Sequence, residues 1–65
     1  MNRLRELRND KGVSVDKLAK SVGNSRANIS RYERGLTQPS LETWEKLAKF
    51  FNVTPQYLVG WSDER

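Results

Sequence analysis

Apolar residues recur along this chain every three or four positions, the spacing that places side chains on one face of an α-helix. The longest stripe, which is expected to face the core, comprises Leu41, Trp44, Leu47, Ala48 and Phe51. No window shows the strict alternation of a half-buried strand. The pattern predicts an all-α fold of five short helices, over residues 3–11, 15–22, 26–34 and 41–51 and from Pro55 to Gly60.

Residues that start and stop helices stand at the ends of these stripes. Ser14, Ser25 and Ser40 precede three of the helices, where a serine hydroxyl can accept hydrogen bonds from the free N–H groups of the first turn. Asn2 and Thr54 are expected to cap the other two. The expected stop residues are Gly12, Gly23, Gly35 and Gly60. Capping and periodicity are independent signals, so their agreement supports the five elements.

The size and composition of the chain exclude several classes of protein. With 65 residues it forms one domain with a small core, expected over residues 1–60 and followed by a flexible tail at 61–65. It contains no cysteine and no histidine, which argues against disulfides, zinc sites and the commonest general base. There is no membrane-span or signal-peptide pattern. The sequence predicts a cytoplasmic protein with no catalytic residues, metal, cofactor or small-molecule ligand.

Charge is distributed unevenly between the two halves of the chain. Residues 1–34 contain nine Lys and Arg against four Asp and Glu, a balance of +5, whereas residues 35–65 contain three against four, a balance of −1. A basic half on a small domain favours a polyanionic partner. The plain alternative is a charged face that only contacts solvent.

Only Gly23 and Asn24 separate the second and third predicted helices. So short a turn forces a steep crossing at close range. Ala19 is small enough for that contact, Gly23 can take a positive φ, and Ile29 would fill the space beneath. These residues specify a helix-turn-helix.

The third helix of this motif would present one basic arc to solvent. At 100° per residue the arc contains Arg26, Ala27, Ser30, Arg31 and Arg34. Ile29 and Tyr32 fall on the opposite, apolar side. Arginine can bond to O6 and N7 of guanine with two parallel hydrogen bonds, and an alanine can contact a thymine methyl group. The arc is therefore suited to the major groove of DNA.

Between Leu4 and Leu58 the chain resembles the helix-turn-helix family of phage Cro proteins and lambda-type repressors. The matching segments are LRELRNDKGVS, LAKSVGNSRANISRYERG and QPSLETWEKLAKFFNVTPQYL. The resemblance implies a compact five-helix bundle of the lambda-repressor-like type. It also implies sequence-specific binding to a pseudo-palindromic DNA operator, usually as a homodimer, to regulate transcription in a bacterial cell or phage-infected host.

The resemblance also assigns candidate DNA contacts. The base-reading positions of the family fall on Arg26, Ala27 and Arg31, with Asn28 and Ser30 as secondary candidates. The candidates for phosphate contacts are Ser14, Lys17, Ser25, Arg34, Thr37 and Gln38.

Two further matches concern how firmly the third helix is held. Arg8 and Glu33 match a pair that forms a partly buried salt bridge between the first and third helices of similar proteins. Val15 is a departure, since the family usually has a glutamine there that bonds a phosphate. We expect one phosphate anchor to be weaker, partly offset by the N–H groups of that helix or by nearby cations.

Phe50 lies at the edge of the predicted core stripe. With Pro55, Val59 and Trp61 it is expected to form an apolar surface patch, and one hypothesis is a two-fold dimer contact. The alternative is a local staple that closes a small core.

Three other classes of function are alternatives to DNA binding. An antitoxin-type or other protein-interaction module would use the same fold, so the fold does not exclude it. An RNA-binding protein usually has exposed aromatic side chains, and the basic half has only Tyr32. An enzyme is not indicated, because no catalytic constellation is present. The chain is either a complete Cro-like protein or the DNA-binding part of a longer repressor.

Overall fold

The structure is a computed structural model that describes residues 2–64. Its helices are α1 (Leu4–Lys11), α2 (Val15–Ser21), α3 (Arg26–Glu33), α4 (Leu41–Phe51) and α5 (Pro55–Val59). The predicted all-α class and all five helices are confirmed, and no strand occurs between residues 2 and 64. The differences are single residues at helix ends. Arg3, Val22, Arg34 and Gly60 were predicted inside helices but are capping residues.

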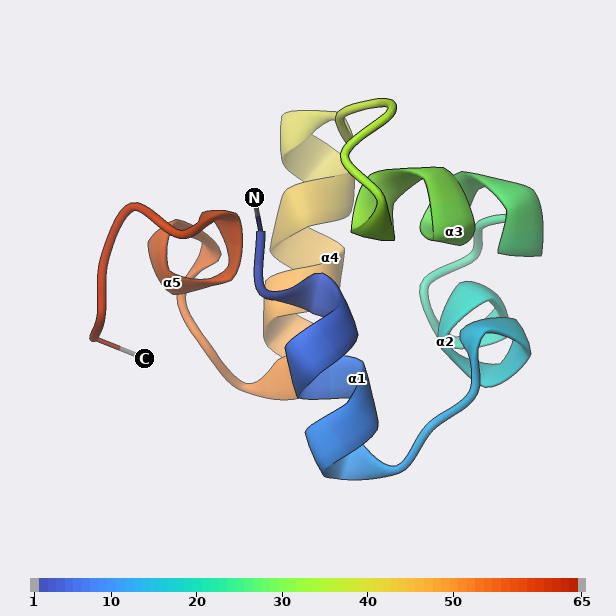
Figure 1. The fold of residues 1–65 in the computed structure, drawn as a ribbon, viewed down its shortest axis with the longest axis horizontal. Helices are drawn as coiled ribbons and strands as arrows, with labels where there is room; N and C mark the ends of the chain where they lie inside the picture. The colour runs from blue at the N-terminus through green and yellow to red at the C-terminus, as the bar shows by residue number, and fades with distance from the viewer. Residues whose placement is uncertain (1, 65) are drawn as a thin grey trace.

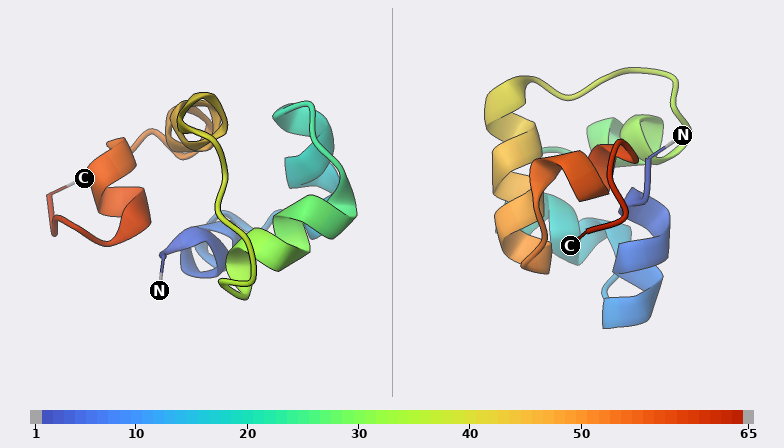
Figure 2. Two further views of the ribbon diagram at one scale, coloured as in Figure 1. Left: turned by 90° about the horizontal axis from the view of Figure 1, so that it is seen from above. Right: turned by 90° about the vertical axis from the view of Figure 1, so that its left-hand side faces the viewer.

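The long helix α4 stands in the middle of the molecule (Figure 1). The α2–α3 pair lies on one side of it, and α5 with the chain that follows lies on the other. The view from above gives the same order (Figure 2). The motif is therefore at one end of the molecule and the C-terminal segment at the other.

Side chains cap four of the helices as predicted. The hydroxyl oxygens of Ser14, Ser25, Ser40 and Thr54 each accept a hydrogen bond from the backbone N–H three residues on. At α1 the capping position is Arg3, whose side chain makes no cap bond, but Asn2 Oδ1 accepts from the N–H of Leu4 at 3.0 Å.

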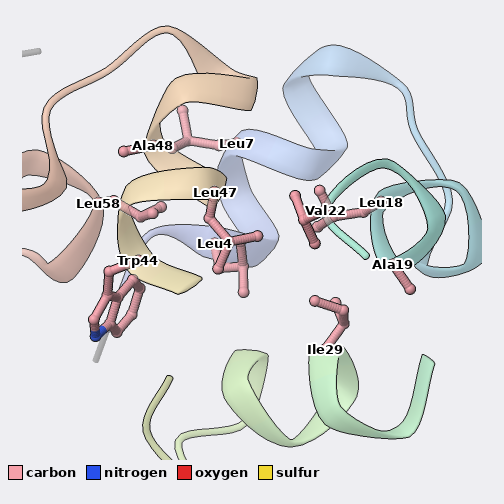
Figure 3. Close-up of a cluster of buried hydrophobic side chains, with 10 residues drawn as sticks. All are labelled: Leu4, Leu7, Leu18, Ala19, Val22, Ile29, Trp44, Leu47, Ala48 and Leu58. Atoms are coloured by element: carbon pink, nitrogen blue, oxygen red, sulfur yellow. The ribbon is translucent and has the colours of Figure 1, made fainter. Parts of the chain in front are cut away.

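The core is a cluster of hydrophobic side chains between the helices, shown in Figure 3. It consists of Leu4, Leu7, Leu18, Ala19, Val22, Ile29, Trp44, Leu47, Ala48 and Leu58. The expectation that Leu41 faces the core is wrong, since 71% of this residue is exposed. Leu41 is the first residue of α4 and lines an open groove beside α5. Phe51 and Tyr32 are half-buried and pack against the cluster.

The segment after α5 lies against the start of the chain. Arg3 Nη1 donates to the carbonyl oxygens of Tyr57 and Ser62 at 2.7 and 2.6 Å, and Arg3 Nη2 to Asp63 Oδ1 at 2.7 Å. The flexibility predicted for residues 61–65 stays a prediction. Residues 61–64 have defined contacts here, and Arg65 lies outside the described residues. None of the helices in residues 2–64 has the length and hydrophobicity of a transmembrane segment.

Candidate nucleic-acid interface

The turn between α2 and α3 has the geometry of a helix-turn-helix. Gly23 has φ +68°, and the N–H of Asn24 donates to the carbonyl of Ala19 at 2.8 Å. Ala19 and Ile29 are buried where the two helices meet. A Cβ at Gly23 would meet no atom within 4 Å, so the glycine is required by the backbone conformation and not by lack of space.

Asn24 holds the start of α3. Its Oδ1 accepts two hydrogen bonds of 2.8 Å, from the N–H of Ser25 and from Nδ2 of Asn28. The Ser25 hydroxyl in turn accepts from the N–H of Asn28 at 3.1 Å. The first turn of α3 is thus tied to the turn before it. This role of Asn24 was not predicted from the sequence, which indicates only a turn residue at this position.

The outer face of α3 has the composition that the helical wheel predicts. Arg26, Ala27, Arg31 and Arg34 are exposed, and Ser30 is half-buried. Behind this face, α3 is anchored in the core by Ile29.

The side chain of Asn28, a secondary base-reading candidate, forms hydrogen bonds within the protein. It is half-buried, its Nδ2 donates to Asn24, and its Oδ1 accepts from Arg31 Nη1 at 3.4 Å. These contacts leave its amide less free to meet a base edge. They make Asn28 a link between Asn24 and Arg31.

The ion pair expected between Arg8 and Glu33 is present. Arg8 Nε donates to Glu33 Oε2 at 2.6 Å and Arg8 Nη2 to Oε1 at 3.2 Å. Arg5 Nε adds a longer bond of 3.4 Å to the same carboxylate. Only 3% of the Glu33 side chain is exposed, so this acid belongs to the support of α3 and not to its outer face.

An ion pair that was not expected joins α2 to α3. Arg26 Nε lies 3.6 Å from Asp16 Oδ1, and both side chains are largely exposed. The two residues are ten positions apart, and the periodicity of a single helix gives no signal for a contact between two helices.

The candidates for phosphate contacts fall into two groups. Ser14 and Ser25 use their hydroxyls as helix caps, and Lys17 is exposed on α2. The second group consists of Arg34, Thr37 and Gln38, on the connection between α3 and α4. These residues line a hollow between this connection and the C-terminal segment, next to Trp44 and Trp61. Val15 is half-buried and packs against the core, so it offers no polar anchor.

The structure separates Phe50 from the rest of the predicted apolar patch. Pro55, Val59 and Trp61 line a groove with Leu41, whereas Phe50 lines a different hollow between α2 and α4. Leu41 and Phe50 are nine positions apart, which places them on opposite sides of α4.

Phe50 contacts its neighbour on α4 and a side chain of α1. Its ring packs edge-on against Phe51 at a centroid distance of 5.0 Å, and Lys11 Nζ lies 5.3 Å from its centroid. The prediction that Phe50 forms one apolar patch with Pro55, Val59 and Trp61 is wrong. The sequence pattern does not indicate on which side of α4 the helix α5 packs.

Comparisons with known proteins agree with this geometry. Residues 4–58 match the model of a helix-turn-helix family. The chain is 36% identical over 62 residues to the cryptic phage CTXphi transcriptional repressor RstR of Vibrio cholerae, covering 95% of this chain and 56% of that protein. It is 42% identical over 57 residues to the transcriptional regulator DdrOP3 of Deinococcus deserti, covering 88% and 44%. The chain thus spans about half the length of these relatives.

Solved structures give the same result. The P22 c2 repressor, in complex with a synthetic operator, superposes with a TM-score of 0.87 at 33% identity, over 92% of this chain and 91% of that one. The restriction-modification controller protein C.AhdI of Aeromonas hydrophila gives 0.80 at 41% identity, over 86% and 85%. These proteins are regulators rather than enzymes, as expected for this chain. From residue 4 to residue 58, the chain belongs to the helix-turn-helix family.

Proposed function

We propose that this protein binds duplex DNA sequence-specifically, by placing α3 in the major groove, and thereby regulates transcription. The observation that carries the proposal is the outer face of α3, where Arg26, Ala27 and Arg31 are exposed together on a helix whose opposite side is buried. The P22 c2 repressor was solved on its operator and is similar over nearly the whole chain, which supports the same mode of binding here. The likeness to RstR supports a phage or prophage type of repressor.

Within this mode the residues divide by role. Arg26 and Arg31 donate to guanine, and Ala27 contacts a thymine methyl group. Ser30 and Asn28 are secondary base contacts. The phosphate contacts come from Ser14, Lys17, Ser25, Arg34, Thr37 and Gln38, which flank α3 on both sides and set its register on the duplex. The protein acts where such DNA lies, in the cytoplasm of a bacterial cell or phage-infected host.

The protein binds its operator as a homodimer, and the groove between α4 and α5 is the contact. The groove has a volume of about 210 Å³ and is lined by apolar side chains that include Leu41, Pro55 and Val59. At its rim Trp61 is 83% exposed. An apolar groove bordered by two exposed large side chains favours a second protein surface. Phe50, which lines a different hollow, is not part of the proposed contact.

This dimer contact lies close to the DNA side of the molecule. Gln38, Trp44, Val59 and Trp61 line both the apolar groove and the hollow that contains Arg34 and Thr37. A two-fold axis that passes beside the groove and runs toward the DNA would place two copies of α3 on the same side of the dimer, as a palindromic operator requires.

Selection of bound duplexes from a random pool tests the proposal. We expect a pseudo-palindrome with half-sites about ten base pairs apart, centre to centre. A single asymmetric half-site would support DNA binding but contradict the dimer. If no duplex were enriched, the proposal would fail, and the exposed groove would favour a protein-interaction module such as an antitoxin.

A further inference from the structure

Asp16 is the one acidic residue on the outer surface of the helix-turn-helix. Helices α2 and α3 contain two acids in all, and the other, Glu33, is buried and paired with Arg8 and Arg5. Asp16 lies in the first turn of α2, and its Oδ1 is 3.6 Å from Nε of Arg26, which begins α3. A carboxylate at this position repels the phosphates of any duplex that approaches. Its presence there calls for a physical reason.

The geometry of the pair supplies one. A guanidinium group has five N–H donors in a planar fork, and a carboxylate at the Nε edge leaves the two terminal nitrogens free. Those two nitrogens can donate in parallel to O6 and N7 of guanine. Asp16 therefore restrains the side chain of Arg26 without using the donors that would read the base.

The other base-reading arginine has a different kind of restraint. Arg31 donates through Nη1 to the neutral amide oxygen of Asn28, at 3.4 Å, and Asn28 is held by Asn24. That restraint carries no charge. Arg26 is thus distinguished from Arg31 by an anionic partner that comes from a second helix.

From these contacts we infer that Asp16 is a positioning residue that sets the base specificity of Arg26. The carboxylate disfavours every duplex by the same amount, through repulsion of phosphates. The restrained side chain increases the affinity only where the terminal nitrogens of Arg26 meet a guanine. The difference in binding free energy between correct and incorrect sites therefore grows. Exclusion of water by the bound DNA strengthens the pair, because the surroundings become less polar. The inference rests on the proposed DNA-binding function.

The test is Asp16→Asn, measured on three duplexes of equal length. These are the selected operator, the operator changed at the base pair that Arg26→Ala identifies as read by Arg26, and a scrambled sequence. We expect tighter binding to the scrambled duplex and a loss of about 2- to 5-fold in discrimination at that one base pair. Discrimination at the base pair read by Arg31 should not change. Asp16→Glu, which keeps the charge, should retain more of the discrimination.

Glu42→Gln is the matched control. Glu42 also lies in the first turn of a helix and forms an exposed ion pair, with Lys46 at 3.5 Å. Its removal changes the net charge by the same amount but should leave discrimination at every base pair intact. In an Arg26→Ala background, Asp16→Asn should have no further effect on discrimination, whereas a role of Asp16 only in the stability of α2 would not depend on Arg26.

The outcomes separate this inference from the function on which it rests. A wild-type protein without preference for any duplex would overturn both. A specific wild-type protein whose discrimination changes no more with Asp16→Asn than with Glu42→Gln would overturn the inference alone.

Discussion

Arg8 ties the buried carboxylate of Glu33 on α3 to α1 through two hydrogen bonds, of 2.6 and 3.2 Å. The same guanidinium donates through Nη1 to the carbonyl oxygen of Val13, at 3.1 Å, just before α2 begins. One side chain therefore connects α1, α3 and the start of α2. Arg8 thus fastens the motif to α1 at two points, although it belongs to neither of its helices.

Replacement of Arg8 by alanine should destabilise the protein strongly. It would leave a buried carboxylate with only the longer contact to Arg5, and loss of one partner of a buried ion pair costs about 3 kcal/mol or more. Urea unfolding measures the free energy directly. Arg5→Ala is the control, and we expect less than about 1 kcal/mol because Arg5 is mostly exposed. Equal losses in the two variants would contradict the central role of Arg8.

Arg31 on α3 and Arg34, which caps the end of α3, should differ in what their removal does to DNA binding. Arg31→Ala is expected to cost about 1–3 kcal/mol on the operator and to relax the preference at one base pair. Arg34→Ala should weaken binding to all sequences alike and reduce the slope of log K against log salt concentration by about 1. Titrations at several salt concentrations would distinguish the two effects. If neither variant changed the affinity for any duplex, the DNA-binding surface would lie elsewhere.

Gly23→Ala isolates the cost of a backbone conformation. The added methyl group would meet nothing within 4 Å, so the loss arises from φ +68° alone. We expect about 1 kcal/mol, which corresponds to a fall in melting temperature of roughly 4–8 °C for a domain of this size. Gly23→Asn should cost less, since asparagine tolerates this conformation better. Thermal unfolding that ranked alanine as equal to glycine would contradict the assignment.

The exposed groove predicts how the dimer responds to substitution. Leu41→Ser should shift sedimentation toward the monomer, because it removes apolar surface from the proposed contact and little from the core. Phe50→Ala should leave the oligomeric state unchanged, since Phe50 lies on the other side of α4. The reverse ranking would return Phe50 to the interface and exclude the groove.

Much of the fold was predictable because its signals are local. The serine and threonine caps, the glycine stops and the apolar stripes each act within one or two helical turns, and their agreement defined all five helices to within one residue at each end. The end of α4 was predicted correctly at Phe51, but by the apolar stripe alone. Asn52 takes the left-handed conformation there, with φ 57°, and no glycine marked the position.

The face of α3 is determined in the same local way, since helical geometry alone brings Arg26, Ala27, Ser30, Arg31 and Arg34 together. Only the tertiary structure decided which neighbours these side chains have. Asp16 meets Arg26 because α2 and α3 pack against each other, and Leu41 is exposed because it lines an open groove beside α5. Arg3 meets Asp63 because the chain returns to its start. Such contacts depend on how helices pack across the core, and the pattern along a single helix carries no information about that.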